Sequence, residues 1–505
     1  MEEMKKNTRS APPHAIAMLE SLRGLGYSTA TALADIIDNS ISAQATEVLV
    51  DFFWDGLSSR VSIRDNGKGM SDSELEGAMR LGNKNPLDVR SRSDLGRFGM
   101  GLKTASLSQC RRLTVLSVQH GISSCLRWDL DELAANPQDG WILFESPASG
   151  SAHYLDAMHG VRSGTIVLWE QMDRIITDSF TVDNFNDLMD DVERHLAMVF
   201  HRLVKGPNAR LKLILNGHAI VGWDPFMSGH PAKPWTSPIS NHATSYGNVS
   251  IQCHVLPHRD RLTRAEYDEN AGPGGWTAQQ GFYIYRNERL LVAGGWLGLG
   301  NGRAWNREEA HRLARIRLDI PNTADADWKI DVRKSSAKPP VVLRSWLMAL
   351  AEDTRERARR VFAYRGSPVS PAASNVPVEQ AWCVQRLKSG MRYRIDEGHP
   401  SIAAVLERSG DLLPLIRSML RVIEETVPVQ RIWLDTAENK ETPRTGFEGE
   451  ATSAIIEVAN ILFQDLVDRK GQSVEEARKT MLRTEPFQKY PSLVAQLGEL
   501  KNVGD

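Results

Sequence analysis

The spacing of apolar residues predicts a mixture of helices and strands over the first two hundred positions. Residues 28–43 have helical spacing, with Ser28 or Thr29 as the N-cap and an apolar side that includes Leu33 and Ile37. The other elements predicted here are strands at 47–54, 60–64, 112–118 and 164–169, a short helix at 72–80 and a long amphipathic helix at about 182–203.

The rest of the chain divides at 366–379, a segment rich in Pro, Ser and Ala that has the composition of a linker. Strands predominate before this segment and helices after it. The predicted strands are 209–216, 248–255, 281–286 and 312–319, with a helix at 341–363, and the later helices are 401–407, 410–425, 450–468 and 473–485. The pattern predicts an α+β protein of several domains with a mainly helical C-terminal region.

Length, charge and cysteine usage narrow the class of protein. A chain of 505 residues is too long for one compact domain, and 61 basic against 63 acidic residues leave a net charge of −2. Bulk charge therefore does not predict a polyanion binder, although a local basic patch stays open. No apolar run approaches a membrane span, and the N-terminal stretch lacks the apolar core of a secretory signal. Four widely spaced cysteines without a CxxC pair indicate a reducing cytoplasm.

The helix predicted at 28–43 carries a polar face that could do chemistry. Asp35, Asp38, Asn39 and Ser42 are spaced i, i+3, i+4 and i+7, so they share one side of the helix. Two carboxylates and an amide can bind a hard cation such as Mg²⁺ or orient a water for attack. Taken alone, the same pattern is more typical of a solvated face on an ordinary amphipathic helix.

Two glycine-rich segments favour a nucleotide. Residues 65–70 (DNGKGM) follow a strand, where Asp65 offers an acceptor for an exocyclic amine such as that of adenine. Residues 96–106 (GRFGMGLKTAS) open into a helix beginning near Met100, whose bare amide groups suit a polyphosphate. The spacings of a P-loop and of a Rossmann fingerprint are both absent. A fourth motif, Ser-Gly-Thr ending at Thr165, leads into a strand.

The order of these four motifs resembles that of the GHKL ATPase superfamily, which includes gyrase-type topoisomerases, the ninety-kilodalton heat-shock chaperone, histidine kinases and MutL. Within it, ALADIIDNSISA, DNGKGM and GRFGMGLKTAS are most similar to the MORC branch and its prokaryotic relatives. The resemblance implies a Bergerat-type α/β sandwich that binds ATP at 14–205 and a transducer-like α/β domain at 206–363. Composition and apolar spacing predict a flexible segment at 1–13, a linker at 364–379 and a helical region at 380–505, which the resemblance does not cover.

The resemblance also implies roles for particular residues. Asp35 stands where the family has its general-base glutamate; because aspartate is one methylene shorter, either the helix sits closer to the nucleotide or hydrolysis is slow. Asn39 would coordinate Mg²⁺, Asp65 would accept from the adenine amino group with support from Thr165, and residues 82–98 would be the lid. The implied nucleotide-binding residues are Asn39, Asp65, Gly67, Gly69, Met70, Asn83, Gly96, Phe98, Gly99, Met100, Gly101, Leu102, Lys103, Thr104 and Thr165.

The second region supplies two candidate phosphate-sensing lysines. Residues 281–291 (GFYIYRNERLL) resemble the transducer domain of MutL and MORC, in which a lysine after an Asp-Val pair reaches the third phosphate. Lys338 matches that spacing, whereas Lys334 is followed directly by a serine. Both lysines therefore remain candidates for the phosphate sensor. Two solvated lysines beside a proline turn are the alternative. A lysine engaged only by a third phosphate could couple nucleotide state to domain orientation.

Two functions are compatible with the resemblance. The first is a conformational switch that binds ATP and Mg²⁺, dimerises with ATP bound, and serves a DNA-linked complex such as an antiphage-defence or restriction–modification system. The alternative is a weakly hydrolysing scaffold or sensor that holds ATP and binds a protein partner through 380–505. Contact with DNA stays open, no membrane interaction is predicted, and the predicted location is the cytoplasm.

Overall fold

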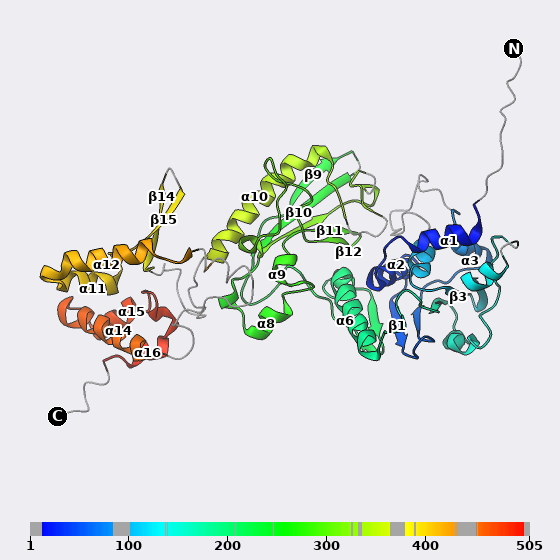
Figure 1. Cartoon of the computed structure of the whole chain (residues 1–505), viewed down its shortest axis with the longest axis horizontal. Helices are drawn as coiled ribbons and strands as arrows, with labels where there is room; N and C mark the ends of the chain where they lie inside the picture. Colours follow the sequence, from blue (N-terminus) through cyan, green and yellow to red (C-terminus); the bar gives the residue numbers. More distant parts are fainter. Residues whose placement is uncertain are drawn as a thin grey trace, which may run out of the picture. The chain divides into compact units, whose positions relative to one another are not determined.

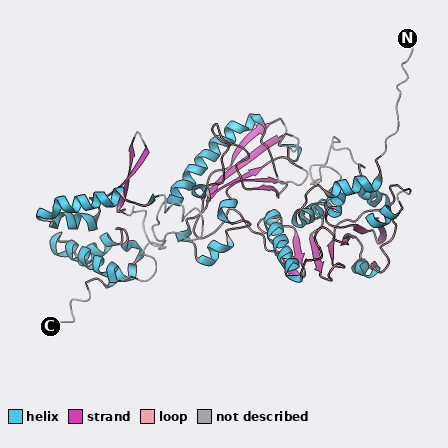
Figure 2. Cartoon of the chain, in the orientation of Figure 1, coloured by secondary structure: helices cyan, strands magenta, loops and turns pink. Residues whose placement is uncertain are grey.

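The computed structural model describes residues 13–83, 101–136, 138, 140–207, 209–245, 247–324, 327–331, 336–363, 379–387, 390–429, 432, 451 and 453–498. Its contacts divide the chain into two compact units, Met1–His258 with Leu262–Ala363 and Arg259–Arg261 with Tyr364–Asp505. Helices and strands mix throughout the first unit, whereas the described part of the second is helical apart from one hairpin (Figure 2).

The first unit begins with a seven-stranded sheet of order β4-β3-β5-β2-β1-β6-β7. Neighbouring strands are antiparallel except β1 and β6, which are parallel. The strands are β1 (Glu47–Phe53), β2 (Arg60–Asp65), β3 (Arg112–Gln119), β4 (Ile122–Asp129), β5 (Gly164–Glu170), β6 (Lys212–Leu215) and β7 (His218–Ala219). The helices are α1 (Ala15–Arg23), α2 (Thr29–Ser42), α3 (Asp72–Met79), α4 (Gly101–Leu107), α5 (Leu130–Ala135), α6 (Val182–Val199) and α7 (His201–Val204), with a 3-10 helix at Ala152–Met158.

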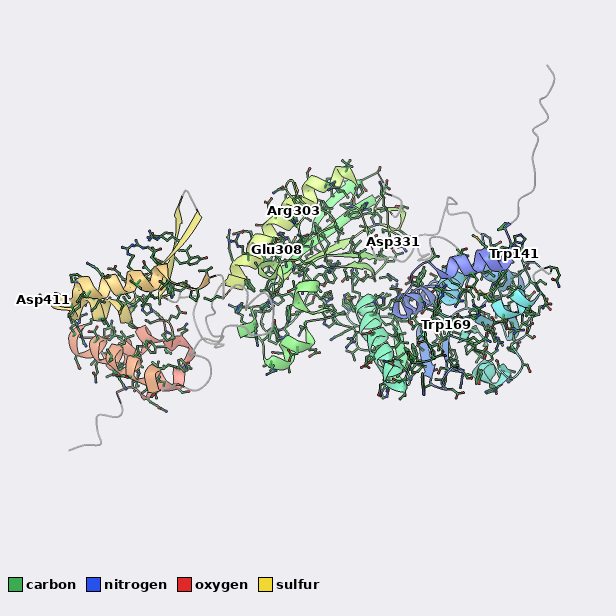
Figure 3. The ribbon with its side chains drawn as sticks, viewed as in Figure 1. Trp141, Trp169, Arg303, Glu308, Asp331 and Asp411 are labelled. Atoms are coloured by element: carbon green, nitrogen blue, oxygen red, sulfur yellow. The ribbon has the colours of Figure 1, made fainter. Side chains whose placement is uncertain are left out.

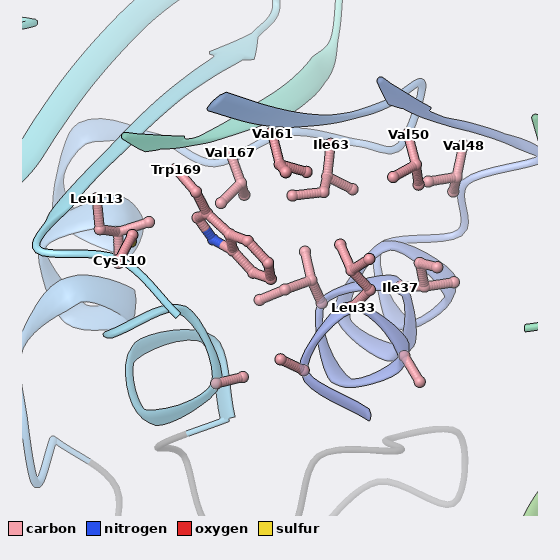
Figure 4. Packing of buried hydrophobic residues seen from close by; sticks show 14 of the residues in the cluster. Leu33, Ile37, Val48, Val50, Val61, Ile63, Cys110, Leu113, Val167 and Trp169 are labelled. Carbon is pink, nitrogen blue, oxygen red and sulfur yellow. The ribbon is translucent and has the colours of Figure 1, made fainter. Parts of the chain in front are cut away.

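Helix α2 forms the centre of the first core. Its start is fixed by a capping box, in which Ser28 Oγ accepts from the Thr31 amide and Thr31 Oγ1 accepts from the Ser28 amide. Leu33 and Ile37 on its apolar side point at the buried valines and isoleucine of the sheet and at Trp169 (Figure 4). Packing of this stripe on one sheet face therefore leaves the opposite, polar side of α2 turned away from the core.

A second sheet follows in the same unit, with strand order β12-β11-β13-β10-β8 and β9 paired to β10. The long helix α10 (Val341–Ala363) lies along it (Figure 1) and buries Leu343, Leu347 and Ala351 in its core. The strands are β8 (Trp235–Thr236), β9 (Ser240–Thr244), β10 (Gly247–Val255), β11 (Gly281–Arg286), β12 (Arg289–Ala293) and β13 (Ala314–Asp319), and the short helices are α8 (Arg264–Glu269), α9 (Gly275–Ala278) and the 3-10 turns Glu309–His311 and Asn322–Ala324.

The second compact unit contains its own small core, formed by residues such as Leu462, Phe463 and Phe487. Its elements are the hairpin β14 (Trp382–Leu387) and β15 (Gly390–Ile395), α11 (Pro400–Arg408), a 3-10 turn at Gly410–Leu412, α12 (Leu413–Glu425), α14 (Ser453–Gln464), a π-helical turn at Asp465–Arg469, α15 (Val474–Met481), a 3-10 turn at Phe487–Lys489 and α16 (Pro491–Gln496). None of the described helices combines the length and apolar composition needed to cross a membrane.

The α+β class and the predicted helices and strands are confirmed, with end points that move by a few residues. The helix predicted at 182–203 is interrupted at Phe200, which separates α6 from α7. Several elements were not predicted, among them α1, α5, β4, β7, β8, β9 and the β14–β15 hairpin. Strand β4 has only exposed or half-buried residues in its first half, and the β14–β15 hairpin interrupts the mainly helical C-terminal region. Neither has the clear alternation of apolar and polar positions by which a strand is recognised.

The buried histidine His254 makes stability depend on pH. It lies in β10 with its Nδ1 3.2 Å from Thr236 Oγ1 and its ring centroid 4.6 Å from that of Phe226. Burial lowers the pKa of this imidazole from 6.5 to about 4, so the folded chain keeps it neutral while the unfolded chain protonates it below pH 6.5.

We predict that His254 contributes stability that is complete above pH 6.5 and is lost as the pH falls toward 4, by about 1.4 kcal/mol per pH unit. Urea unfolding of His254→Gln between pH 7.5 and 4.5 should therefore show a shallower fall with acid than the wild type. The exposed His218, replaced by Gln, is the control and should leave the slope unchanged. Equal slopes for wild type and His254→Gln would contradict the prediction.

Candidate functional site

The carboxylate of Asp65, at the end of β2, is held by donors from three directions. Ser40 Oγ on α2 donates to its Oδ2 at 2.8 Å, and the Gly67 amide donates to its Oδ1 at 2.9 Å. The third donor is the backbone of Thr165, the residue opposite Asp65 in the β2–β5 register. Burial raises the pKa of Asp65, and these three hydrogen bonds oppose the rise. Since a carboxylate accepts about four hydrogen bonds, about one position is left for a further donor such as an exocyclic amine.

A hydroxyl network behind Asp65 fixes the turn that follows it. Thr165 Oγ1 lies 2.9 Å from Ser117 Oγ on β3, and that oxygen accepts from the Met70 amide at 2.8 Å. Gly69 has a φ of +70°, and a Cβ there would lie 1.8 Å from the carbonyl oxygen of Val118. The turn thus closes against β3 because the chain has no side chain at this position.

The polar side of α2 is divided between buried and exposed residues. Asp35 and Asp38 are only 6% and 2% exposed, whereas Asn39 is exposed one turn after Asp35. Ser42 donates back to the Asp38 carbonyl oxygen. The simple solvated face considered from the sequence is therefore wrong for the two carboxylates, which both lie inside the protein and must be compensated there.

Asp35 is joined to helix α4 through a tyrosine. The Tyr27 hydroxyl donates to Asp35 Oδ2 at 3.0 Å and also shares a hydrogen bond with the Thr104 side chain of α4. Burial and the neighbouring carboxylate raise the pKa of Tyr27 well above its ordinary value, so the phenol stays a donor. Asp35, the predicted base, and Thr104, a predicted phosphate-binding residue, thus both bond the hydroxyl of Tyr27.

The second carboxylate, Asp38, is paired with an arginine of the second sheet. Arg289 Nε, at the start of β12, donates to Asp38 Oδ1 and Oδ2 at 3.2 and 3.1 Å, and Arg289 Nη2 lies 3.7 Å from Asp35 Oδ1. The sequence analysis missed Arg289, Tyr27, Ser40 and Ser117. Ser40 could have been suspected because it follows Asn39, but the others adjoin the site only after folding.

Lys103, predicted to line the phosphates, has other partners in the structure. Its ammonium group is buried and donates to the carbonyl oxygens of Ala78 and Arg80 at 2.9 and 2.8 Å, at the C-terminal end of α3. A cation suits this end of a helix because its last carbonyl groups are unsatisfied. Asn83 is exposed, with its side-chain amide over Gly77 of α3. A phosphate contact for Lys103 stays a prediction.

Several predicted residues lie outside the described part of the chain: Gly96, Phe98, Gly99, Met100, Lys334, and the lid from residue 84 onward. Of the rest, Gly101 and Leu102 begin α4, and Lys338 is exposed with its amide bonded to the Trp328 carbonyl oxygen. Asp331 (Figure 3) is close enough for its charge to raise the pKa of Tyr27. Asp331 therefore lies near the Tyr27–Asp35 pair.

Comparison with known proteins gives a family match over the part of the chain that contains Tyr27, α2 and Asp65. Residues 27–165 match the family described as histidine kinase-, DNA gyrase B-, and HSP90-like ATPase. The chain carries a GHKL-type ATPase domain. A 96-residue segment, 19% of the chain, is 28% identical to ATPase morc-1 of Caenorhabditis elegans, and this segment spans 11% of the nematode protein. The likeness to this MORC ATPase is therefore confined to a small part of each protein.

The residues around α2 have the chemistry that magnesium-bound ATP requires. Asp65 keeps acceptor capacity for an amine, and the exposed Asn39 presents an amide oxygen, a ligand that Mg²⁺ accepts. At Gly67 a Cβ would lie 2.9 Å from the Ala43 carbonyl oxygen, so a glycine is needed for this turn to pack against the end of α2 and keep Asp65 in place. A separate cavity of about 820 Å³, lined by Met18, Trp128, Trp141 and their neighbours, has Gly82 and Leu81 at its edge but none of the predicted nucleotide residues.

We predict that the close approach of Gly69 to β3 can be separated from its backbone conformation by a matched pair of variants. Gly56 also has a positive φ, +52°, but nothing lies within 4 Å of the position of its Cβ. Gly56→Ala should cost about 1 kcal/mol for the left-handed conformation alone, whereas Gly69→Ala should cost about 3 kcal/mol or more because the turn must also move away from Val118. Chemical unfolding measures both losses, and equal losses would contradict the predicted clash.

Proposed function

We propose that the chain is an ATP-driven conformational switch that hydrolyses ATP slowly at α2 and passes the nucleotide state to its second sheet. The observation that carries the proposal is the bond from Ser40 to Asp65. It ties the candidate adenine acceptor to the same helix that bears Asp35 and Asn39, so that one element spans base recognition and phosphate chemistry. Membership of residues 27–165 in the GHKL ATPase family supports the same activity.

In this function the protein groups have distinct tasks. Asp65 accepts a hydrogen bond from the adenine amine, while Gly67 and Gly69 let the turn that follows Asp65 pack tightly against Ala43 and Val118. Asp35 orients a water toward the third phosphate and takes its proton, as a general base must. Tyr27 fixes one oxygen of Asp35, and the other oxygen lies 3.7 Å from Arg289 Nη2. Asn39 holds Mg²⁺, which when bound neutralises phosphate charge.

The lysine that senses the third phosphate is proposed to be Lys334 or Lys338, from the second sheet's region. The charge of Asp331 raises the pKa of Tyr27, and Asp331 closely precedes Lys334 in the sequence, which supports Lys334 as the first candidate. We further propose that ATP binding favours a homodimer, since a closed dimer with higher affinity for ATP than for ADP would complete a cycle. Likeness to a MORC ATPase supports a DNA-linked role, of which antiphage defence in the cytoplasm is our preferred setting.

A second candidate function is an ATP-holding scaffold that binds a protein partner through 380–505. The presence of aspartate at position 35 favours it, because the shorter side chain reaches less far toward a water. The exposed apolar side chains of α12, among them Leu415, Met419 and Val422, also suit a protein partner. Turnover measurements separate the two functions.

We predict that Asp35→Ala lowers kcat for ATP by about 100-fold or more, while ATP affinity stays close to that of wild type. Asp35→Glu should retain activity or exceed it, because it restores the longer carboxylate. Phosphate release and calorimetry with a non-hydrolysable ATP analogue measure these quantities, with Asn39→Ala as the comparison that should lose Mg·ATP binding instead. Turnover unaffected by Asp35→Ala would favour the scaffold.

We predict that Asp65→Asn weakens ATP binding by about 10- to 100-fold, because it replaces a charged acceptor and a hydrogen bond to a charged group contributes about 1.5–3 kcal/mol. Asp51→Asn on the adjacent strand β1 is the matched control, since Asp51 is half-buried in the same sheet but lies outside the proposed pocket. Calorimetric titration with the ATP analogue should leave the control unchanged. An unaltered affinity in Asp65→Asn would remove Asp65 from the site.

A further inference from the structure

The β11–β12 hairpin of the second sheet carries a tight turn whose ends contact the ATPase domain. Arg286 pairs with Arg289, so the loop is only Asn287 and Glu288, and both have positive φ, 49° and 68°. Two-residue turns of this kind match the twist of the strands, but a left-handed glutamate costs about 1 kcal/mol or more relative to glycine. The turn thus carries a glutamate at a position where glycine would have less backbone strain. Strained positions of this kind cluster at functional sites.

The two residues at the end of this hairpin point to different parts of the ATPase domain. Glu288 forms an ion pair with Arg202 Nε of α7 at 2.6 Å, and Arg202 Nη1 bonds Asp319 of β13 at 2.6 Å. Arg289 instead turns toward α2. The hairpin is therefore held by one ionic link near α7 and by a second that reaches the helix bearing the proposed base.

All three nitrogens of the Arg289 guanidinium are engaged, and the group is almost fully buried. Nε bonds both oxygens of Asp38, Nη1 donates to the Leu290 carbonyl oxygen at 2.6 Å, and Nη2 lies 3.7 Å from Asp35 Oδ1. Since Tyr27 binds Asp35 Oδ2, the two oxygens of this carboxylate have separate partners, one just before α2 and one on the second sheet. A planar, multiply bonded guanidinium fixes direction as well as charge.

We propose that Arg289 is a positioning residue for hydrolysis, which fixes the orientation of the Asp35 carboxylate and makes that orientation depend on where the second sheet lies. The inference rests on the proposed function, in which Asp35 is the base. If the sheet moves when a third phosphate is bound, Arg289 moves with it, and the base is aligned in one state only. A general base must lie within hydrogen-bond reach of its proton, so a shift of about 1 Å is enough to change the rate about 100-fold.

A purely structural role is the main alternative, because Arg289 also neutralises the buried Asp38. Removing one member of a buried ion pair destabilises a protein strongly, whereas replacing both by apolar residues is often neutral. The double variant Arg289→Met with Asp38→Leu therefore restores folding while it leaves Asp35 without its guanidinium. It separates the two roles.

The experiment measures thermal unfolding, affinity for a non-hydrolysable ATP analogue, and kcat of the full chain. We expect Arg289→Met to be destabilised, with kcat lowered about 100-fold and ATP affinity nearly unchanged. The double variant should regain stability but not kcat, and Arg289→Lys should regain part of kcat. Arg202→Met is the matched control: it breaks the other ionic link of the same hairpin without touching Asp35, and should lower stability with far less effect on kcat.

Two results would overturn the inference alone: a kcat in Arg289→Met equal to that of wild type, or a kcat that returns together with stability in the double variant. A wild-type chain that binds the analogue but hydrolyses no ATP would overturn the proposed function and the inference together. The two failures are therefore distinguishable by the wild-type turnover.

Discussion

A helix that buries two carboxylates on one side must have a compensating partner for each. For α2 these partners come from the chain just before it and from the second sheet. Tyr27 donates a hydrogen bond to Asp35, Arg289 pairs with Asp38, and the neighbouring Ser40 donates a hydrogen bond to Asp65. Burying an unpaired carboxylate would cost several kcal/mol. The second sheet is therefore tied electrostatically to the ATPase domain, because it carries the cation that Asp38 requires.

The position of Asp65, the candidate acceptor for adenine, depends on strand order. Asp65 and Thr165 are a hundred residues apart in the chain, yet β2 and β5 are neighbours and their register sets these two residues opposite each other. Ser117, from β3 on the far side of β5, completes the hydroxyl network. A rigid sheet thus supplies the position of the acceptor, and the turn at Gly69 closes only because its backbone can approach β3.

Two ionic links join the ATPase domain to the hairpin of the second sheet, and they differ in what they touch. The Arg202 link meets acidic groups away from α2, while the Arg289 link ends on α2 itself. A switch needs an element whose two positions are favoured differently by two ligands. The hairpin fits this requirement in our proposal, because its side chains contact the helix that would hold the phosphates and the base.

The sequence by itself predicted the helix at 28–43, most strands of both sheets and the motifs around Asp35, Asn39, Asp65 and Thr165, because these depend on local periodicity and on residue types close together in the chain. It could not predict which polar residues of α2 would be buried, that Lys103 would bond the end of α3, or that Tyr27 and Arg289 would meet Asp35. Those facts depend on contacts between residues up to 254 positions apart, such as Asp35 and Arg289. Only the packing of the two sheets against α2 brings such residues together.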